Sequence, residues 1–144
     1  MQNDSSRDQT TGRIIGCCFA VHGELGPGFP EKVYQAALAM SLESADFRVE
    51  RERRFRVLFD RKPVGDFQVD LLIKGCVVLE VRAVVGPMPG VFAAQLLAYL
   101  KAAQMPVGLL VNFGNPSCQV KRVSLSSAKS VQNLRNQPGM LVSS

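Results

Sequence analysis

The sequence is poor in the residues from which metal sites and nucleophilic catalytic sites are most often built. It contains one histidine, His22, and four cysteines, none of which forms a Cys-x-x-Cys pair. A cluster of histidine ligands is therefore excluded, a zinc site is not expected, and a nucleophile paired with histidine could use only His22. The simpler interpretation of His22 is a polar residue near the end of a helix.

Long apolar runs are also missing. The first ten residues are polar and do not resemble a signal peptide, and no segment reaches the roughly 18 consecutive apolar residues of a membrane span. The cysteine pattern fits a reducing compartment. We therefore expect a cytoplasmic protein with no membrane partner.

Acidic residues are absent after Glu80. Up to that position twelve acidic and eleven basic residues nearly balance, whereas six basic residues and no acidic one follow it. A field of this sign would attract a polyanion such as nucleic acid. A basic excess of this size is also typical of an ordinary solvated surface, so charge alone does not decide between them.

The composition is that of one globular domain. Of 144 residues, 47% are hydrophobic and 20% are charged, which is enough to bury a core. We expect a disordered N-terminus over residues 1–10, one domain over residues 11–126, and a polar, disordered tail over residues 127–144.

Hydrophobic periodicity predicts two helices followed by a sheet with a third helix inserted. The first helix begins near Thr11 and ends at the glycines and proline of residues 26–30, and the second covers residues 30–45. The predicted strands cover residues 47–59, 66–73, 76–84, 107–113 and 119–125, with a turn over residues 60–65 and a helix over residues 91–103. This order implies an α/β sandwich in which three strands form an antiparallel meander and a later strand returns through a helical crossover.

Two of these strands each carry one acidic residue among aliphatic ones. A two-residue loop between them would put Asp70 and Glu80 on opposite faces, whereas a three-residue loop pairs Leu72 with Cys76 and brings both carboxylates and Arg82 onto one face. The three-residue loop also unites the apolar residues on the other face, which are Val69, Leu71, Val77, Leu79 and Val81. We favour this register, in which Asp70 lies diagonal to Glu80 with Cβ atoms about 7 Å apart. Both carboxylates could then bind one hard cation such as Mg²⁺.

The same residues also have a purely structural interpretation, because a half-exposed sheet has a polar face and Arg82 could simply neutralise a carboxylate. Two further features favour a site. Glu31 lies in the first turn of the second helix and could approach the two carboxylates, although the helix dipole alone favours an acidic residue at that position. Gln95 and Tyr99 are four residues apart and share one side of the third helix, although such a pair is also common as surface polarity.

Taken together, these residues resemble the GxxExxY family, a group within the PD-(D/E)xK nuclease-like superfamily. Gly28, Glu31 and Tyr34 match the motif that names the family, and the similarity extends over roughly residues 13–125. The resemblance implies an α/β fold with a restriction-endonuclease-like αβββαβ core, a mixed sheet flanked by helices. That core agrees with the order of elements predicted from periodicity.

The resemblance also implies roles for individual residues. Asp70 and Glu80 correspond to the metal ligands of the superfamily, with Mg²⁺ or Mn²⁺ as the cofactor. Glu31 is similar to the helical acid of several such nucleases, and Gln95 with Tyr99 is similar to their element that contacts the nucleic acid, DNA or RNA.

Two positions depart from the family pattern. Arg82 stands where the motif has lysine, and arginine keeps the positive charge but cannot give up a proton. Phe92 stands where relatives often have histidine. These departures leave three hypotheses open. The chain is a magnesium-dependent nuclease in which Asp70, Glu80, Arg82 and Glu31 are catalytic, a nucleic-acid-binding module that has lost turnover, or a domain that associates with a protein partner or with itself.

Overall fold

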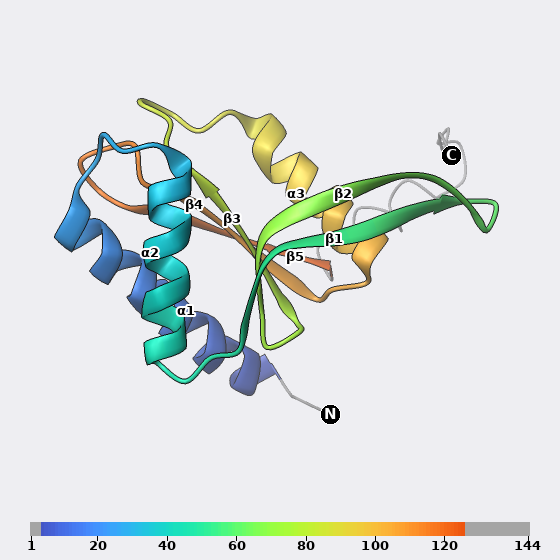
Figure 1. Cartoon of the computed structure of the whole chain (residues 1–144), viewed down its shortest axis with the longest axis horizontal. Helices are drawn as coiled ribbons and strands as arrows, with labels where there is room; N and C mark the ends of the chain where they lie inside the picture. The colour runs from blue at the N-terminus through green and yellow to red at the C-terminus, as the bar shows by residue number, and fades with distance from the viewer. Residues whose placement is uncertain (1–3, 126–144) are drawn as a thin grey trace.

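The structure is a computed structural model, and it describes residues 4–125. The elements follow one another along the chain as shown in Figure 1, in the order α1 (Asp4–Leu25), α2 (Glu31–Ser44), β1 (Val49–Phe59), β2 (Lys62–Ile73), β3 (Val77–Arg82), α3 (Gly90–Ala103), β4 (Val107–Asn112) and β5 (Gln119–Ser124). This order confirms the predicted sequence of helices and strands.

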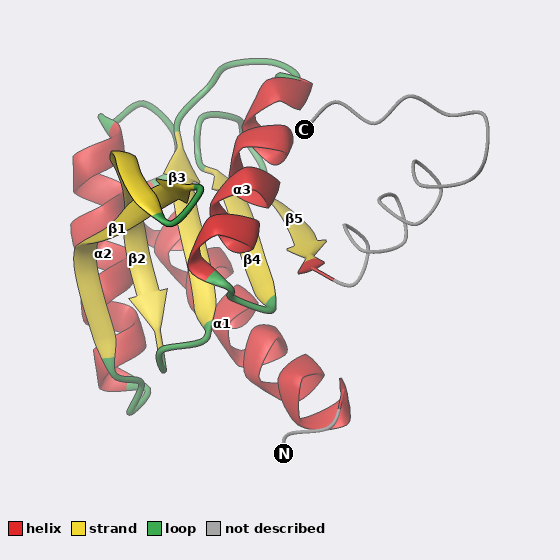
Figure 2. Cartoon of the chain, turned by 90° about the vertical axis from the view of Figure 1, so that its right-hand side faces the viewer, coloured by secondary structure: helices red, strands yellow, loops and turns green. Residues whose placement is uncertain are grey.

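The five strands form one mixed sheet in the order β1-β2-β3-β4-β5. β3 and β4 are parallel and are connected by α3, whereas every other neighbouring pair is antiparallel. Helices α1 and α2 cover one face of the sheet and α3 covers the other (Figure 2). The predicted meander, helical crossover and α/β architecture are therefore confirmed.

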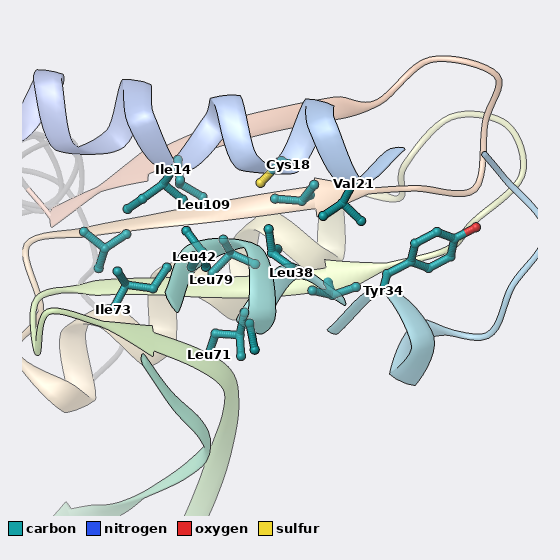
Figure 3. Close-up of a cluster of buried hydrophobic side chains, with 14 of the residues drawn as sticks. Ile14, Cys18, Val21, Tyr34, Leu38, Leu42, Leu71, Ile73, Leu79 and Leu109 are labelled. Atoms are coloured by element: carbon teal, nitrogen blue, oxygen red, sulfur yellow. The ribbon is translucent and has the colours of Figure 1, made fainter. Parts of the chain in front are cut away.

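Each face of the sheet has its own hydrophobic core. The larger core lies under α1 and α2, where alternate strand residues meet apolar side chains from both helices (Figure 3), including Ile14, Cys18, Val21, Leu38, Leu42, Leu71, Ile73, Leu79 and Leu109. A smaller core lies under α3 and contains Val69, Leu72, Val78, Leu96, Leu100 and Leu110. β4 is buried along its whole length because helices cover both of its faces.

Helix α1 begins at Asp4, so the prediction that residues 1–10 are disordered is wrong from Asp4 onward. Thr11, near which the helix was expected to begin, lies inside it. Its hydroxyl donates to the carbonyl of Asp8 (3.1 Å) within the helix, a bond that threonine makes readily in helix interiors. The carboxylate of Asp8 also accepts a hydrogen bond from Arg122 of β5 (2.6 Å), which ties this part of α1 to the sheet.

The hairpin of β1 and β2 is longer than predicted, because its turn takes only two residues. Asp60 and Arg61 have φ values of 51° and 61°, the left-handed pair that a two-residue loop requires, and Phe59 pairs with Lys62. The predicted turn over residues 60–65 is thus wrong for residues 62–65, which are strand. The sequence does not predict this part of the strand, because proline, here Pro63, cannot donate to the backbone hydrogen bonds of a sheet. Here it lies at a register shift.

The hairpin of β2 and β3 corrects the predicted register by one pair of residues. Ile73 pairs with Val77, so the three-residue loop is Lys74-Gly75-Cys76, closed by a hydrogen bond from the N–H of Cys76 to the carbonyl of Ile73 (3.1 Å). This register keeps Ile73 buried in the ladder instead of placing it in the loop. Because the shift is even, the faces assigned to Asp70, Glu80 and Arg82 are unchanged.

The predicted tail over residues 127–144 lies outside the described residues. None of the helices in the described part of the chain combines the length and the apolar character that crossing a bilayer requires.

Candidate active site at the fork between β2 and β3

The candidate site lies where β2 and β3 separate. The backbone ladder between them ends at the pair Leu71 and Leu79. Beyond that pair, hydrogen bonds to side chains join the two strands in place of backbone pairs. The Glu80 carboxylate accepts a hydrogen bond from the N–H of Asp70 (3.2 Å), and the Asp70 carboxylate accepts one from the N–H of Val81 (2.8 Å). In the observed register Asp70 lies directly opposite Glu80, rather than diagonal to it as predicted.

On its other side, Asp70 faces an irregular position of β1. Regular pairs on either side join Arg51 to Leu71 and Arg53 to Val69, and Glu52 between them has a left-handed φ of 55°. The strand changes face here, since Val69 packs under α3 whereas Leu71 packs under α1 and α2. The prediction that Val69 and Leu71 share one continuous apolar face is therefore wrong. Asp70 lies between them, where the apolar side chains of β2 change from one face of the sheet to the other.

Arg82 contacts both carboxylates. Its Nη1 lies 3.3 Å from Oε2 of Glu80 and 3.7 Å from Oδ2 of Asp70, and it donates to the carbonyl of Val81 (2.9 Å). Its Nη2 donates to Oε1 of Gln95 on α3 (3.1 Å). The guanidinium thus lies between the fork and α3, where only 14% of its side chain is exposed.

Phe92 supports the same guanidinium from the start of α3. The Cζ atom of Arg82 lies 4.8 Å from the centre of the Phe92 ring, the geometry of a cation–π contact. The two positions that depart from the family pattern therefore touch each other. A planar guanidinium stacks on an aromatic ring better than the compact ammonium of lysine, so the two departures suit each other physically.

Two side chains at the site have raised pKa values. Burial, and secondly the negative charge of Asp70, raise the pKa of the Glu80 carboxyl from 4.5 to about 7. The backbone hydrogen bond from Asp70 and the charge of Arg82 oppose this rise without cancelling it. Burial also raises the pKa of Tyr99, with the charge of Glu80 as the second cause. A shifted carboxyl next to a second carboxylate is a common property of functional sites.

Helix α3 contributes the two residues that were predicted to contact substrate. Gln95 reaches the site through Arg82, whereas the Tyr99 ring stacks on Phe67 of β2 with ring centres 4.3 Å apart. Tyr99 lies close enough to the carboxylates to feel the charges of Glu80 and Asp70. Both predicted positions thus lie beside the fork.

Helix α2 reaches the fork through a residue that the sequence did not reveal. Gln35 donates from its side chain to the carbonyl of Asp70 (3.1 Å), and it is buried. Glu31 lies one helical turn before Gln35 and therefore on the same side of α2. Its side chain is exposed and makes no ion pair or hydrogen bond with any described residue. Glu31 thus lies on the side of α2 that carries Gln35 but is not joined to the other site residues.

Tyr34, the last residue of the Gly-x-x-Glu-x-x-Tyr motif, holds the loop before α2. Its hydroxyl donates to the carbonyl of Gly26 (2.5 Å) and accepts from the N–H of Phe29 (3.1 Å), and its ring stacks on Phe113. Gly28 has a φ of 115°, a conformation that residues with a Cβ atom rarely adopt. The glycine and tyrosine of the motif therefore shape the loop that leads into α2, where Glu31 is the first residue.

The segment after Arg82 is fixed by two asparagines. Asn112 accepts from the N–H of Val84 (2.8 Å) and donates to its carbonyl (3.0 Å), and Asn115 makes the same pair of bonds with Gly86 (2.8 and 2.9 Å). These four hydrogen bonds hold the backbone at Val84 and Gly86, in the connection that leads from β3 to α3.

The donor set can be tested against a magnesium ion. Magnesium is bound through one or two carboxylates and otherwise water, which two converging carboxylates satisfy. No group of three or more histidine, cysteine, aspartate or glutamate side chains within residues 4–125 has a metal-binding arrangement. The residues therefore fit a sparsely liganded Mg²⁺, and Arg82 supplies the remaining positive charge near the carboxylates.

Most of the predicted site comes together in space. Asp70, Glu80 and Arg82 are in mutual contact, with Gln95 joined to them and Tyr99 alongside, while Glu31 stays apart. The sequence did not reveal the roles of Gln35 and Phe67. Gln35 had a weak signal, since it is a polar residue beside the apolar face of its helix.

Comparisons with known proteins agree with this architecture. A model of the PD-(D/E)XK nuclease superfamily matches residues 8–123. The chain is also similar to the crystal structure of SSO0001, with 18% identity, a TM-score of 0.53, and coverage of 74% of this chain and 59% of that one. At this identity the likeness concerns the fold alone. No curated protein matches the chain.

The family-model match spans the fork, β1 to β4, α3 and most of β5. The narrower resemblance to the GxxExxY group depends on Gly28, Glu31 and Tyr34 and stays a prediction. The chain belongs to the PD-(D/E)XK nuclease superfamily.

Proposed function

We propose that the protein is a metal-dependent nuclease that hydrolyses phosphodiester bonds at the fork between β2 and β3. The observation that carries the proposal is the convergence of Asp70, Glu80 and Arg82 in a largely buried cluster, whose carboxyl groups cross-link two separating strands. In this proposal Asp70 and Glu80 hold Mg²⁺ or Mn²⁺. When bound, such an ion acts as a Lewis acid on a phosphoryl oxygen and lowers the pKa of a bound water.

Arg82 has a limited chemical role in this proposal. Its guanidinium stays protonated, so it can hold a phosphate oxygen or the attacking water but cannot accept a proton from it. Glu31, exposed in the first turn of α2, would support the site when substrate is present. Gln95 orients Arg82, and Tyr99 contacts the nucleic-acid strand beside it.

The test is divalent-dependent cleavage of labelled single- and double-stranded DNA and RNA. Wild-type protein should cut at least one of these with Mg²⁺ or Mn²⁺ and none with a chelator. Asp70→Asn and Glu80→Gln, which preserve side-chain shape, should lower cleavage by at least 100-fold if both hold the metal. Glu43→Gln, a matched change at an exposed position of α2, should leave it unchanged. Equal cleavage by wild-type protein and Asp70→Asn would refute the proposal.

A second candidate is a nucleic-acid-binding module without turnover. The specific observation in its favour is that the Arg82 guanidinium is already engaged by Glu80, the Val81 carbonyl, Gln95 and the Phe92 ring. Its signature is salt-sensitive binding without product, because contacts to phosphates release counterions. Arg82→Lys separates the candidates. Cleavage that appears only in this variant identifies a degenerate nuclease, whereas cleavage by the wild type excludes the second candidate.

A further inference from the structure

The hairpin of β1 and β2 extends well past the rest of the sheet. We call residues 53–69 of this hairpin the arm. In Figure 1 the arm projects away from the helices, and Figure 2 shows its end curving clear of the sheet. Its outer half is exposed on both strands, from Leu58 to the turn and from Lys62 to Asp66. Most of the arm therefore makes no contribution to either hydrophobic core.

The base of the arm is fixed next to the candidate site. Phe55 of β1 stacks on Phe67 of β2 with ring centres 5.5 Å apart, and Phe67 stacks in turn on Tyr99 of α3 at 4.3 Å. Aromatic pairs of this kind add stability beyond the area that they bury. Because Tyr99 lies beside Glu80 and Asp70, the stack sets the direction of the arm relative to the site.

The arm is basic, and its charges are available. It contains five basic and two acidic residues. One acidic residue, Asp66, pairs with Arg54. Arg56, Arg61 and Lys62 are exposed and make no ion pair with any described residue. Exposed cations without ion-pair partners attract a polyanion. It also disfavours pairing with a second copy of the same arm, because like charges would meet.

The length of the arm matches a duplex. From Asp70 to Lys62 the strand advances eight residues, which at about 3.3 Å per residue is about 26 Å. Double-stranded nucleic acid advances about 3.4 Å per base pair and is stiff over this distance. A duplex with one phosphodiester at the site would therefore carry phosphates past the end of the arm roughly eight base pairs away. A two-stranded ribbon of this kind also fits the major groove of DNA.

We propose that the arm binds the backbone of double-stranded nucleic acid about eight base pairs from the fork. Arg61 and Lys62 contact phosphates there, and Arg56, which lies opposite Asp66 in the sheet, contacts phosphates about halfway along the arm. The Phe55–Phe67–Tyr99 stack holds the arm in line with the site. This inference deepens the proposed function, because it assumes that the same nucleic acid reaches Asp70 and Glu80. It specifies a duplex with a long flank as the preferred ligand.

The test is the binding of a fluorescein-labelled 24-base-pair DNA duplex, measured by anisotropy in the presence of a chelator so that no cleavage occurs. The arm variant carries Arg56→Ala, Arg61→Ala and Lys62→Ala. The control variant removes three exposed cations away from the arm, with Arg48→Ala, Lys74→Ala and Lys101→Ala. Both variants have the same net charge, so a general loss of positive charge affects them equally.

The arm variant should bind the duplex at least 10-fold more weakly than wild-type protein in 0.1 M salt. The slope of log affinity against log salt should fall by about 3, since each lost phosphate contact removes about 0.9. The control variant should change the slope by less than 1. Equal losses in the two variants would overturn the inference, as would wild-type affinity in the arm variant.

The experiment also separates this inference from the proposed nuclease activity. Arm-dependent binding by a wild-type protein that cuts no substrate supports the inference and refutes the activity. If the wild-type protein cuts nucleic acid and the arm variant binds and cuts normally, the nuclease activity is supported and this inference is refuted. Light scattering completes the test: if the arm variant changes only the oligomeric state and not DNA binding, the arm is a protein interface and the inference is wrong.

Discussion

Replacing Glu80 by glutamine should make the stability of the metal-free protein less dependent on pH. In the folded protein the Glu80 carboxyl is buried beside Asp70, and these two causes raise its pKa from 4.5 to about 7. In the unfolded chain both causes disappear. Glutamine keeps the hydrogen-bond acceptor for the N–H of Asp70 but has no proton to lose, so it removes the titration without removing the side chain.

The direction and size of the effect follow from linkage between protonation and folding. Because the folded protein binds this proton more tightly than the unfolded chain, the contribution of Glu80 to stability is greatest below pH 4.5 and is lost as the pH rises toward 7. Each unit of pKa difference corresponds to about 1.4 kcal/mol, so the full loss is about 3 kcal/mol. At pH 8, Glu80→Gln should avoid this loss. At pH 4 the Glu80 carboxyl is mostly protonated in both the folded and the unfolded wild-type protein, so its titration should cause little difference in stability between the two proteins.

Urea unfolding at pH 4 and pH 8 in a chelator measures this directly. The free energy of unfolding should fall by about 3 kcal/mol more in wild-type protein than in Glu80→Gln between these two values. Titrating groups that do not interact with Glu80 change both proteins alike, so they cancel in the comparison. An equal pH dependence in the two proteins would refute the assignment of Glu80 as a buried carboxyl with a raised pKa.

Three further outcomes follow from the structure. Mg²⁺ at pH 8 should raise the melting temperature of wild-type protein but not of Glu80→Gln, since a ligand stabilises only the state that binds it; an equal rise in both would contradict the metal site. Tyr34→Phe should lower stability by about 1–3 kcal/mol, because two backbone groups of the loop over residues 26–29 lose their partner. Urea unfolding measures it, and an unchanged midpoint would contradict the role of the hydroxyl. Gly114→Ala should cost roughly 1–3 kcal/mol, because its Cβ atom would lie 2.4 Å from the carbonyl oxygen of Val84. As a control, Gly16→Ala in α1, where a Cβ atom has open space, should be neutral or stabilising, and urea unfolding measures both glycine variants.

The contact between Arg82 and Phe92 changes how the departures from the family pattern are interpreted. Taken separately, each is a lost functional group. Together they form a stacked pair that holds a permanent cation between the carboxylates and α3. A site built in this way keeps its charge balance while it gives up the proton chemistry of lysine. Pairing Arg82→Lys with Phe92→His is therefore the natural extension of the cleavage experiment.

The alternation of polar and apolar residues was sufficient to predict the layers of the fold. The period of the apolar residues in α2 and in the strands, with the glycines and prolines between them, indicated the elements and their order. The same alternation placed Asp70, Glu80 and Arg82 on one face, because the correct and the predicted registers differ by an even shift. The family motif added the expectation of a nuclease fold, which the superfamily match confirms.

Features that depend on exceptions to local preference were not predictable. The two-residue turn has Arg61 where such turns favour glycine, and Pro63 lies within a strand, so the local sequence did not predict the length of the arm. The change of face at Asp70 arises from pairing with an irregular position of β1. No local pattern in β2 encodes that irregularity.

The sequence by itself determined which residues are apolar, how they alternate, and hence the order of elements and the shared face of the acidic residues. Only the tertiary structure decided that the two carboxylates bridge separating strands, that Arg82 lies against Phe92, and that the basic hairpin is held beside the site. The physical reason is that alternation is a local property of the chain. Contacts between Asp70, Arg82 and the residues of α3 depend on strand divergence and helix packing, which are set by segments distant in sequence.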